Sequence, residues 1–199
     1  MMQNSLSRTF FLAKGCKQVP LDASRGIVRW AHPEGYFLKP NGQKAADNLS
    51  PSKAERGSHG HPAPILRECA KECHILMALA FYGPRPTFTD PKTGKEYVGI
   101  CHHLIPDLKN YKPANLLCWL TRAEHAEADR RQRALKKVVP NGDLHLFSYE
   151  RLRYLQDPRT TSREVFETEL AALAQQGFTL DNLDFDARMS RDMSHHMEC

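Results

Sequence analysis

Hydrophobic residues recur at changing intervals along this 199-residue chain, and the intervals predict an α+β fold. Two short apolar runs, at residues 27–30 and 36–38, are followed by a Pro-Asn-Gly turn signal and predict a small β-hairpin or meander. Apolar positions with helical spacing between residues 65 and 81 predict a core-facing helix. The first half of the chain therefore combines a hairpin with a helix.

The pattern of residues 98–138 predicts a strand, a loop, a second strand and a helix in succession. Residues 98–102 and 116–120 are the expected strands, and prolines bound the irregular loop between them. Thr121 and Glu124 form a capping box, which predicts the start of a polar helix that runs to about residue 138. Local signals alone thus predict a strand–loop–strand–helix unit.

The C-terminal part has weaker signals. Residues 144–155 are amphipathic, but their pattern leaves the type of secondary structure ambiguous. A second capping box, with Thr161 as N-cap and Glu164 three residues on, predicts a helix to about residue 176 that Gly177 ends. The remaining tail is acidic and then rich in Met and His, and we expect it to be frayed.

These patterns predict three segments. Residues 1–64 form an N-terminal segment with the hairpin and a flexible linker, which is rich in Ser, Asn, Gly, Pro and Lys. Residues 65–139 form the core, and residues 140–199 form a helical segment with the tail.

Composition narrows the function classes. The chain is 41% hydrophobic with a mean hydropathy of −0.56, and no stretch approaches the roughly 18 apolar residues that span a bilayer. Its start lacks the features of a signal peptide, so we expect a cytoplasmic protein and no membrane partner. The six cysteines are then expected to be thiols or metal ligands and not disulfides.

Charge is distributed unevenly. The net charge of +5 divides into +8 for residues 1–150 and −3 for residues 151–199. A basic body with a mildly acidic tail fits a polyanionic partner such as nucleic acid.

The candidate chemistry lies in the strand–loop–strand–helix unit. His102 and His103 end the first strand, Asn115 follows twelve residues after His103, and His125 follows ten residues later. Adjacent residues of a strand point to opposite sides, so one histidine can face a metal while the other faces a water molecule. A neutral imidazole, whose ordinary pKa is near 6.5, can accept a proton from water at pH 7.

This constellation resembles the HNH (His-Me finger, ββα-metal) endonuclease motif, in which a two-stranded hairpin and a helix grip one divalent ion. Residues 74–84 (HILMALAFYGP) resemble the helix that precedes the motif in phage-type homing endonucleases, which extends the resemblance to about residues 74–133. The resemblance implies metal-dependent hydrolysis of DNA phosphodiester bonds. It leaves both flanks of the chain unassigned.

The resemblance also implies a role for each motif residue. His103 corresponds to the general base, and His102 and His125 correspond to metal ligands. Asp129 lies one helical turn after His125, where colicin-type nucleases have a second helical ligand. Asn115 is expected to hydrogen-bond across the loop and hold the strand end that carries the base.

The identity of the metal stays open. Many homing-type members have Asp before the base and Asn on the helix, where this chain has His102 and His125. Two imidazoles suit Zn²⁺, Ni²⁺ or Mn²⁺ better than Mg²⁺, although Mg²⁺ is abundant in cells. A separate structural zinc site is conceivable at four cysteines: Cys69, Cys73, Cys101 and Cys118. Because these cysteines lack paired C-x-x-C spacing, we expect them to be buried thiols instead.

Basic residues in the loop and on the helix are candidate DNA contacts. They can bind phosphate groups and position a duplex, or simply form a solvated helix face. The candidates are Lys109, Lys112, Arg122, Arg130, Arg131 and Arg133.

The patterns predict an α+β protein with a small β-hairpin and helices on either side of the core, and the resemblance implies that this core is a ββα-metal unit that binds and nicks double-stranded DNA. Two alternatives remain: an HNH fold that binds DNA without cutting it, and a structural zinc-binding module. Oligomeric state and target sequence are not predicted.

Overall fold

The computed structural model describes residues 6–20, 28–45, 73–107 and 110–177. The chain divides into two units, Met1–Trp119 and Leu120–Cys199, and each is described by itself. This division reflects only which parts of the chain are compact. It does not test the three segments predicted from the sequence, so they stay a prediction. No helix within the described ranges is both long enough and apolar enough to cross a membrane.

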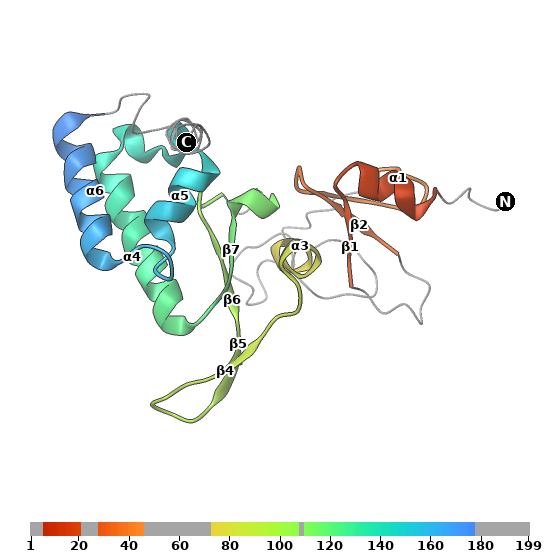
Figure 1. Cartoon of the computed structure of the whole chain (residues 1–199), viewed down its shortest axis with the longest axis horizontal. Coiled ribbons are helices and arrows are strands. Elements are labelled where there is room, and N and C mark those ends of the chain that lie inside the picture. The colour runs from red at the N-terminus through yellow and green to blue at the C-terminus, as the bar shows by residue number, and fades with distance from the viewer. Residues whose placement is uncertain (1–5, 21–27, 46–72, 108–109, 178–199) are drawn as a thin grey trace, which may run out of the picture. The chain divides into compact units, whose positions relative to one another are not determined.

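The first unit begins with a short helix and a three-stranded sheet (Figure 1). Helix α1 (Arg8–Ala13) starts at the N-cap Ser7, although the sequence around it shows no clear periodicity. The sheet has the order β1-β2-β3, and both pairs of strands are antiparallel: β1 (Lys17–Gln18), β2 (Trp30–His32) and β3 (Tyr36–Leu38). The predicted hairpin is confirmed.

Helix α3 (Cys73–Tyr82) supplies the centre of the first unit's core. Its residues 73–78 are all buried, as expected for a helix that is apolar on every side. It packs with Ala31 and Phe37 of the first sheet and with Cys101 and Cys118. The predicted helix is confirmed from residue 73 on, and its earlier part lies outside the described residues.

Two further pairs of strands complete the first unit. Strands β4 (Thr87–Thr89) and β5 (Glu96–Val98) pair antiparallel and form a hairpin that the sequence analysis did not predict. Strands β6 (Ile100–His103) and β7 (Leu116–Leu120) form a separate two-stranded sheet. The short 3-10 helix Pro113–Asn115 leads directly into β7.

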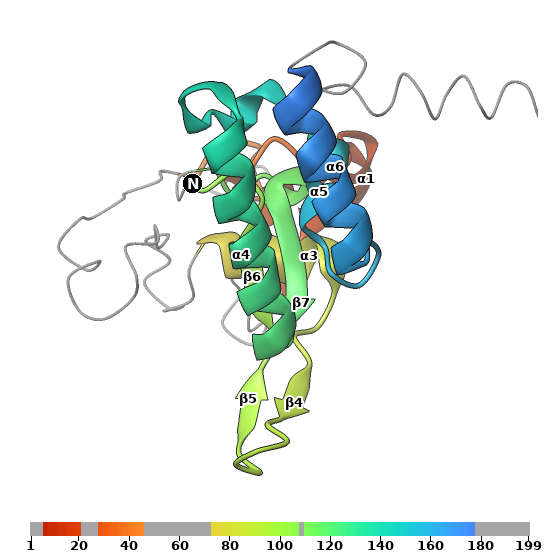
Figure 2. The same ribbon diagram turned by 90° about the vertical axis from the view of Figure 1, so that its left-hand side faces the viewer.

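The second unit consists mainly of helices (Figure 2). Helix α4 (Arg122–Val138) begins with the predicted capping box of Thr121 and Glu124. Short 3-10 helices (Pro140–Gly142 and Leu144–Leu146) lead to α5 (Tyr149–Gln156), and α6 (Arg163–Gln176) follows. Contacts join α4 to both α5 and α6.

The start of α6 differs by one residue from the prediction. The N-cap is Ser162, whose hydroxyl accepts a hydrogen bond from the Val165 backbone N–H, and not Thr161. Thr161 is buried, and its carbonyl oxygen accepts a hydrogen bond from Arg131. Gly177 ends the helix with a φ of 70°, as predicted.

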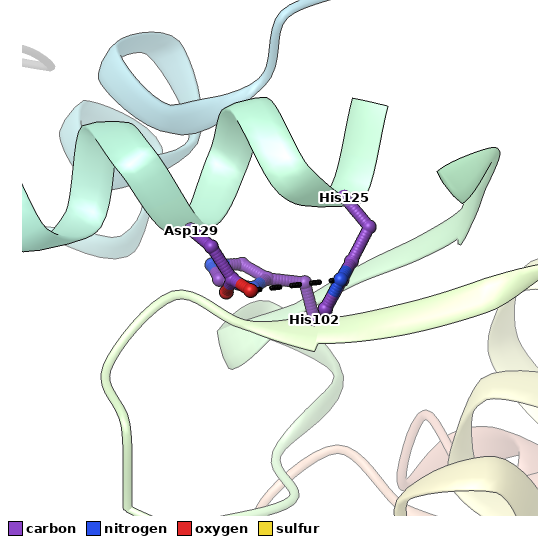
Figure 3. A group of neighbouring side chains, drawn as sticks. All are labelled: His102, His125 and Asp129. Atoms are coloured by element: carbon purple, nitrogen blue, oxygen red, sulfur yellow. Dashed lines mark ion pairs between the residues drawn. The ribbon is translucent and has the colours of Figure 1, made fainter. Parts of the chain in front are cut away.

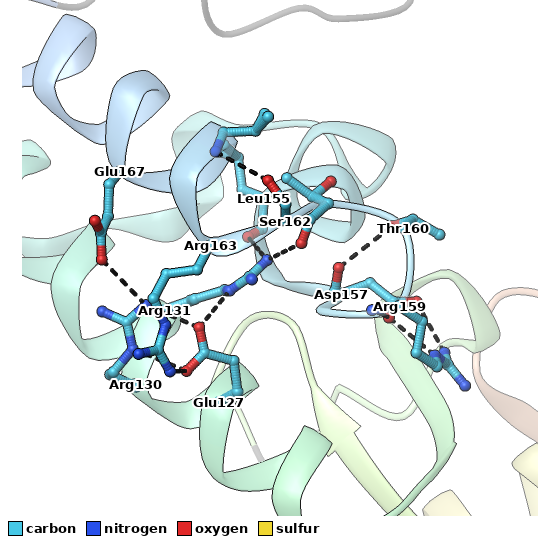
Figure 4. Close-up of polar contacts among 12 residues, drawn as sticks. Glu127, Arg130, Arg131, Leu155, Asp157, Arg159, Thr160, Ser162, Arg163 and Glu167 are labelled. Atoms are coloured by element: carbon cyan, nitrogen blue, oxygen red, sulfur yellow. Dashed lines mark hydrogen bonds and ion pairs between the residues drawn. The ribbon is translucent and has the colours of Figure 1, made fainter.

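A network of charged side chains holds the three helices of the second unit together (Figure 4). Glu127 accepts hydrogen bonds from Arg130 (2.8 and 2.9 Å), from Arg131 (3.0 Å) and from Arg163 of α6 (2.9 Å). Arg131 also donates to the carbonyl oxygens of Leu155 (3.4 Å) and Thr161 (2.9 Å). The guanidinium of Arg131 lies over the Phe166 ring, 5.2 Å from its centroid.

This network makes the stability that Glu127 contributes depend on pH in the acid range. The hydrogen bonds from Arg130 lower the pKa of Glu127 from 4.5 to about 2; burial opposes the shift, and Arg131 and Arg163 add to it. A carboxylate whose folded pKa is depressed stabilises the fold above its unfolded pKa, and this contribution disappears as pH falls through the folded pKa.

We therefore predict that Glu127→Gln lowers the free energy of unfolding by about 2 kcal/mol at pH 6. The difference from wild type narrows as pH falls from 5 to 2, because the wild-type carboxylate becomes protonated in that window. Urea unfolding at several pH values measures it, with Glu150→Gln at an exposed position of α5 as the control. If the free energies of unfolding of wild type and Glu127→Gln differ by the same amount down to pH 2, the ionised carboxylate of Glu127 contributes nothing to stability.

Candidate metal centre

Three side chains that the sequence singled out as metal ligands come together. One ligand atom each from His102, His125 and Asp129 forms a group in which all atoms lie within 4.8 Å of one another. Figure 3 shows His125 and Asp129 on α4 and His102 on β6. The His125 Nδ1 and Asp129 Oδ2 atoms are 3.6 Å apart, close to the separation of two ligands that share one ion.

The local fold explains why His125 and Asp129 share a face. They are four residues apart in α4, so their side chains lie one turn apart on the same side of the helix. Glu127 and Arg131 are each two residues further on, which turns them by roughly 200° around the helix axis. The charged network therefore occupies one face of α4 and leaves the opposite face to the candidate ligands.

The chemistry of the donors fits a divalent transition metal. Two imidazole nitrogens and one carboxylate oxygen suit Zn²⁺, Mn²⁺ or Ni²⁺, whereas Mg²⁺ prefers an all-oxygen shell. Three protein ligands leave coordination positions for water or substrate, as catalytic metal sites require. His102 is buried and the two helical residues are half-buried, so an ion here would be partly shielded from solvent.

His103, the candidate base, lies beside the metal ligand His102 at the end of β6 and is only 7% exposed. Its ring packs against the ring of His74 on α3, with 5.1 Å between the centroids and an angle of 57° between the planes. His74 is also buried, at 5% exposure. This contact limits rotation of the His103 imidazole.

Sequence analysis did not single out His74. It lies in a helical stretch where six consecutive residues are buried, so hydrophobic periodicity does not distinguish one side of the helix. A polar residue inside an apolar helix is the signal that would have marked it.

Asn115 makes the predicted hydrogen bonds across the loop between β6 and β7. Its side chain is fully buried. The Oδ1 atom accepts from the Ile105 backbone N–H (2.8 Å), and Nδ2 donates to the carbonyl oxygens of Ile105 (3.2 Å) and Asn110 (2.8 Å). The Asn115 carbonyl oxygen also accepts from the Leu104 N–H (2.9 Å), so this residue ties down the chain just after His103.

The cysteines near the strands are buried thiols where the structure describes them. Cys101 and Cys118 lie side by side with their sulfur atoms 3.3 Å apart, and Cys73 is buried in the same core. Cys69 lies outside the described residues, so the conceivable four-cysteine zinc site is not tested.

The predicted DNA contacts lie in different environments. Arg122 and Arg133 are exposed on α4. Arg130 is ion-paired with Glu127 and lies 3.8 Å from Glu167. These three residues remain candidates for phosphate contacts.

The other three residues predicted to contact DNA are Lys112, Arg131 and Lys109. Lys112 pairs with Glu34 at 2.7 Å, and this hydrogen bond lowers the pKa of the Glu34 carboxyl. Arg131 is 1% exposed and bound to three oxygen acceptors of the second unit, so it stabilises the helices instead of contacting phosphate. Lys109 lies outside the described residues.

Comparisons with models of known protein families, with curated proteins and with solved structures found no match to this chain.

We predict that Asn115→Ala lowers the free energy of unfolding by about 3 kcal/mol, because it removes three hydrogen bonds, two of them buried, and takes the side-chain acceptor away from the buried Ile105 N–H. Asn115→Asp should also destabilise, because two donors become acceptors that face carbonyl oxygens. Asn41→Ala, in an exposed turn, should change stability by less than about 0.5 kcal/mol. Urea denaturation measures all three, and a loss below about 1 kcal/mol for Asn115→Ala would contradict the bracing role.

Proposed function

We propose that this chain is a metal-dependent endonuclease of the HNH type, which hydrolyses phosphodiester bonds of double-stranded DNA. The observation that carries the proposal is the group His102, His125 and Asp129, whose ligand atoms lie within 4.8 Å of one another. These residues are separated by 23 and 4 positions in the sequence, yet they form a donor set suited to one divalent ion.

The environment of His103 supports the same proposal. Hydrolysis of a phosphodiester requires that a water molecule lose a proton as it attacks phosphorus in line with the leaving oxygen. His103 follows the ligand His102 directly, and His74 packs against its ring. In our proposal, His103 accepts that proton while Asn115 holds the strand end in place.

A divalent ion bound at the three ligands would supply positive charge for the developing negative charge on the phosphate and the leaving oxygen. The protein's own part is to hold the ion, orient the base and bind the duplex. One such group per chain serves one strand at a time, so nicking is the expected activity of a monomer.

The test is conversion of supercoiled plasmid to its nicked form with Mg²⁺, Mn²⁺, Ni²⁺ or Zn²⁺, together with hydrolysis of bis(p-nitrophenyl) phosphate. We predict metal-dependent activity that EDTA abolishes. His103→Ala should lower the rate at least about 100-fold, because a general base contributes about that factor or more. His145→Ala, which changes an exposed histidine on the second unit, should leave the rate unchanged.

Two outcomes would overturn the proposal. DNA binding without hydrolysis of either substrate, with every metal, would favour a binding-only protein. Stoichiometric zinc retained by cysteines, together with full activity of His103→Ala, would favour a structural zinc module.

A further inference from the structure

The hairpin of β4 and β5, which we call the ribbon arm (residues 87–98), extends away from the rest of the first unit (Figures 1 and 2). Its strands pair through Thr87 with Val98, Phe88 with Tyr97, and Thr89 with Glu96. Thr87, Thr89 and Val98 are exposed, as is every residue of the turn from 91 to 95. The arm therefore adds almost nothing to the buried core.

A two-stranded hairpin this short is marginally stable alone, so the arm needs internal support. The rings of Phe88 and Tyr97 pack across the strands with 5.8 Å between their centroids. At the tip, the Asp90 carboxylate accepts hydrogen bonds from the backbone N–H groups of Lys92 (2.9 Å) and Thr93 (3.1 Å). The tip is thus an ordered turn.

The base of the arm is fixed to the strand that carries His102 and His103. Gly99, the one residue between β5 and β6, donates from its N–H to the Pro86 carbonyl oxygen (2.8 Å) and accepts from Arg85 Nε (2.6 Å). A Cβ atom at Gly99 would lie 3.1 Å from the Trp119 Cα, a tight contact that would push the two backbones apart slightly and that glycine avoids. The direction of the arm is therefore set by the same strand that positions the candidate site.

The cationic side chains of the arm lie at its tip. Lys92 and Lys95 are exposed, and the arm also holds two acidic residues. The Asp90 carboxylate faces the backbone of the turn, and Glu96 follows Lys95 directly and is exposed. The two aromatic rings pack against each other and are half-buried, and Val98 is exposed at the base of the arm. The two lysines are therefore the side chains of the tip that a polyanion can bind.

We propose that the ribbon arm is a DNA-binding element that lies in a groove of the duplex, with Lys92 and Lys95 contacting phosphate groups. This inference rests on the proposed nuclease function. The major groove is wide enough for a two-stranded β-ribbon. An extended chain rises about 3.3 Å per residue, so the path of seven residues from His102 to Lys95 covers roughly 23 Å, or about seven base pairs of DNA.

The experiment measures binding of a 40-base-pair duplex in EDTA, where cleavage is blocked, over a series of salt concentrations. It compares wild type with Lys92→Ala/Lys95→Ala and with a second double variant, Lys17→Ala/Lys39→Ala, in which Lys17 lies in β1 and Lys39 directly follows β3. Hydrolysis of bis(p-nitrophenyl) phosphate, which needs no groove, is measured for all three proteins. Because both tip lysines are exposed, their replacement should not affect folding.

We expect the tip variant to bind the duplex more weakly, with a plot of log affinity against log salt that is shallower by about 2, one for each lost phosphate contact. Its hydrolysis of the small diester should equal that of wild type. The second double variant should retain the wild-type salt dependence.

An unchanged salt dependence in the tip variant would overturn the ribbon arm as a DNA contact, while diester hydrolysis by wild type would leave the proposed nuclease intact. If the wild-type protein neither binds the duplex nor hydrolyses the diester, both proposals fail. Weaker diester hydrolysis in the tip variant would also overturn this proposal, since the lysines would then act through the site.

Discussion

The second unit depends on one buried ion pair, between Glu127 and Arg131 of α4. Arg131 is 1% exposed, and removing a guanidinium from water is costly unless every donor finds an acceptor. This desolvation cost is offset by hydrogen bonds from Arg131 to Glu127 and to the carbonyl oxygens of Leu155 and Thr161. Leu155 lies at the end of α5, and Thr161 lies just before α6. These bonds fix the rotation of α4, and so determine that His125 and Asp129 face away from the other two helices.

Asn115 has the corresponding role in the first unit. Its side-chain amide and its carbonyl oxygen together bind Leu104, Ile105 and Asn110, which closes the loop that follows His103. A residue with both a donor and an acceptor is needed here, because the loop presents one N–H and two carbonyl oxygens to the side chain. Arg131, together with Glu127, thus orients α4, which carries His125 and Asp129. Asn115 orients the end of β6, which carries His102.

Features set by local interactions could be predicted from the sequence. The capping box at Thr121 and Glu124 and the glycine that ends α6 each depend on residues within one turn, and both predictions are confirmed. The same local reasoning was wrong for Thr161, because Thr161 and Ser162 are both good N-caps and tertiary contacts bury the first of them. The spacing of four residues predicted that His125 and Asp129 share a helix face, and the resemblance to the HNH motif implied that His102 lies near them, as it does.

Features that depend on tertiary packing could not be predicted. The sequence does not reveal which face of α4 meets α5 and α6, so Arg131 looked like its exposed neighbour Arg133. His74 was hidden in a helix that is buried on every side. The ribbon arm was missed because its strands are only three residues long, so their alternation of exposed and half-buried positions is too short to mark a strand in the sequence.

Titration calorimetry with Mn²⁺ measures whether one divalent ion binds to His102, His125 and Asp129. We predict one ion per chain for wild type and for His145→Ala, which changes an exposed histidine. His102→Ala and His125→Ala should lose that binding while both variants remain folded by circular dichroism. Wild-type stoichiometry and affinity in either folded ligand variant would show that these side chains do not hold the ion.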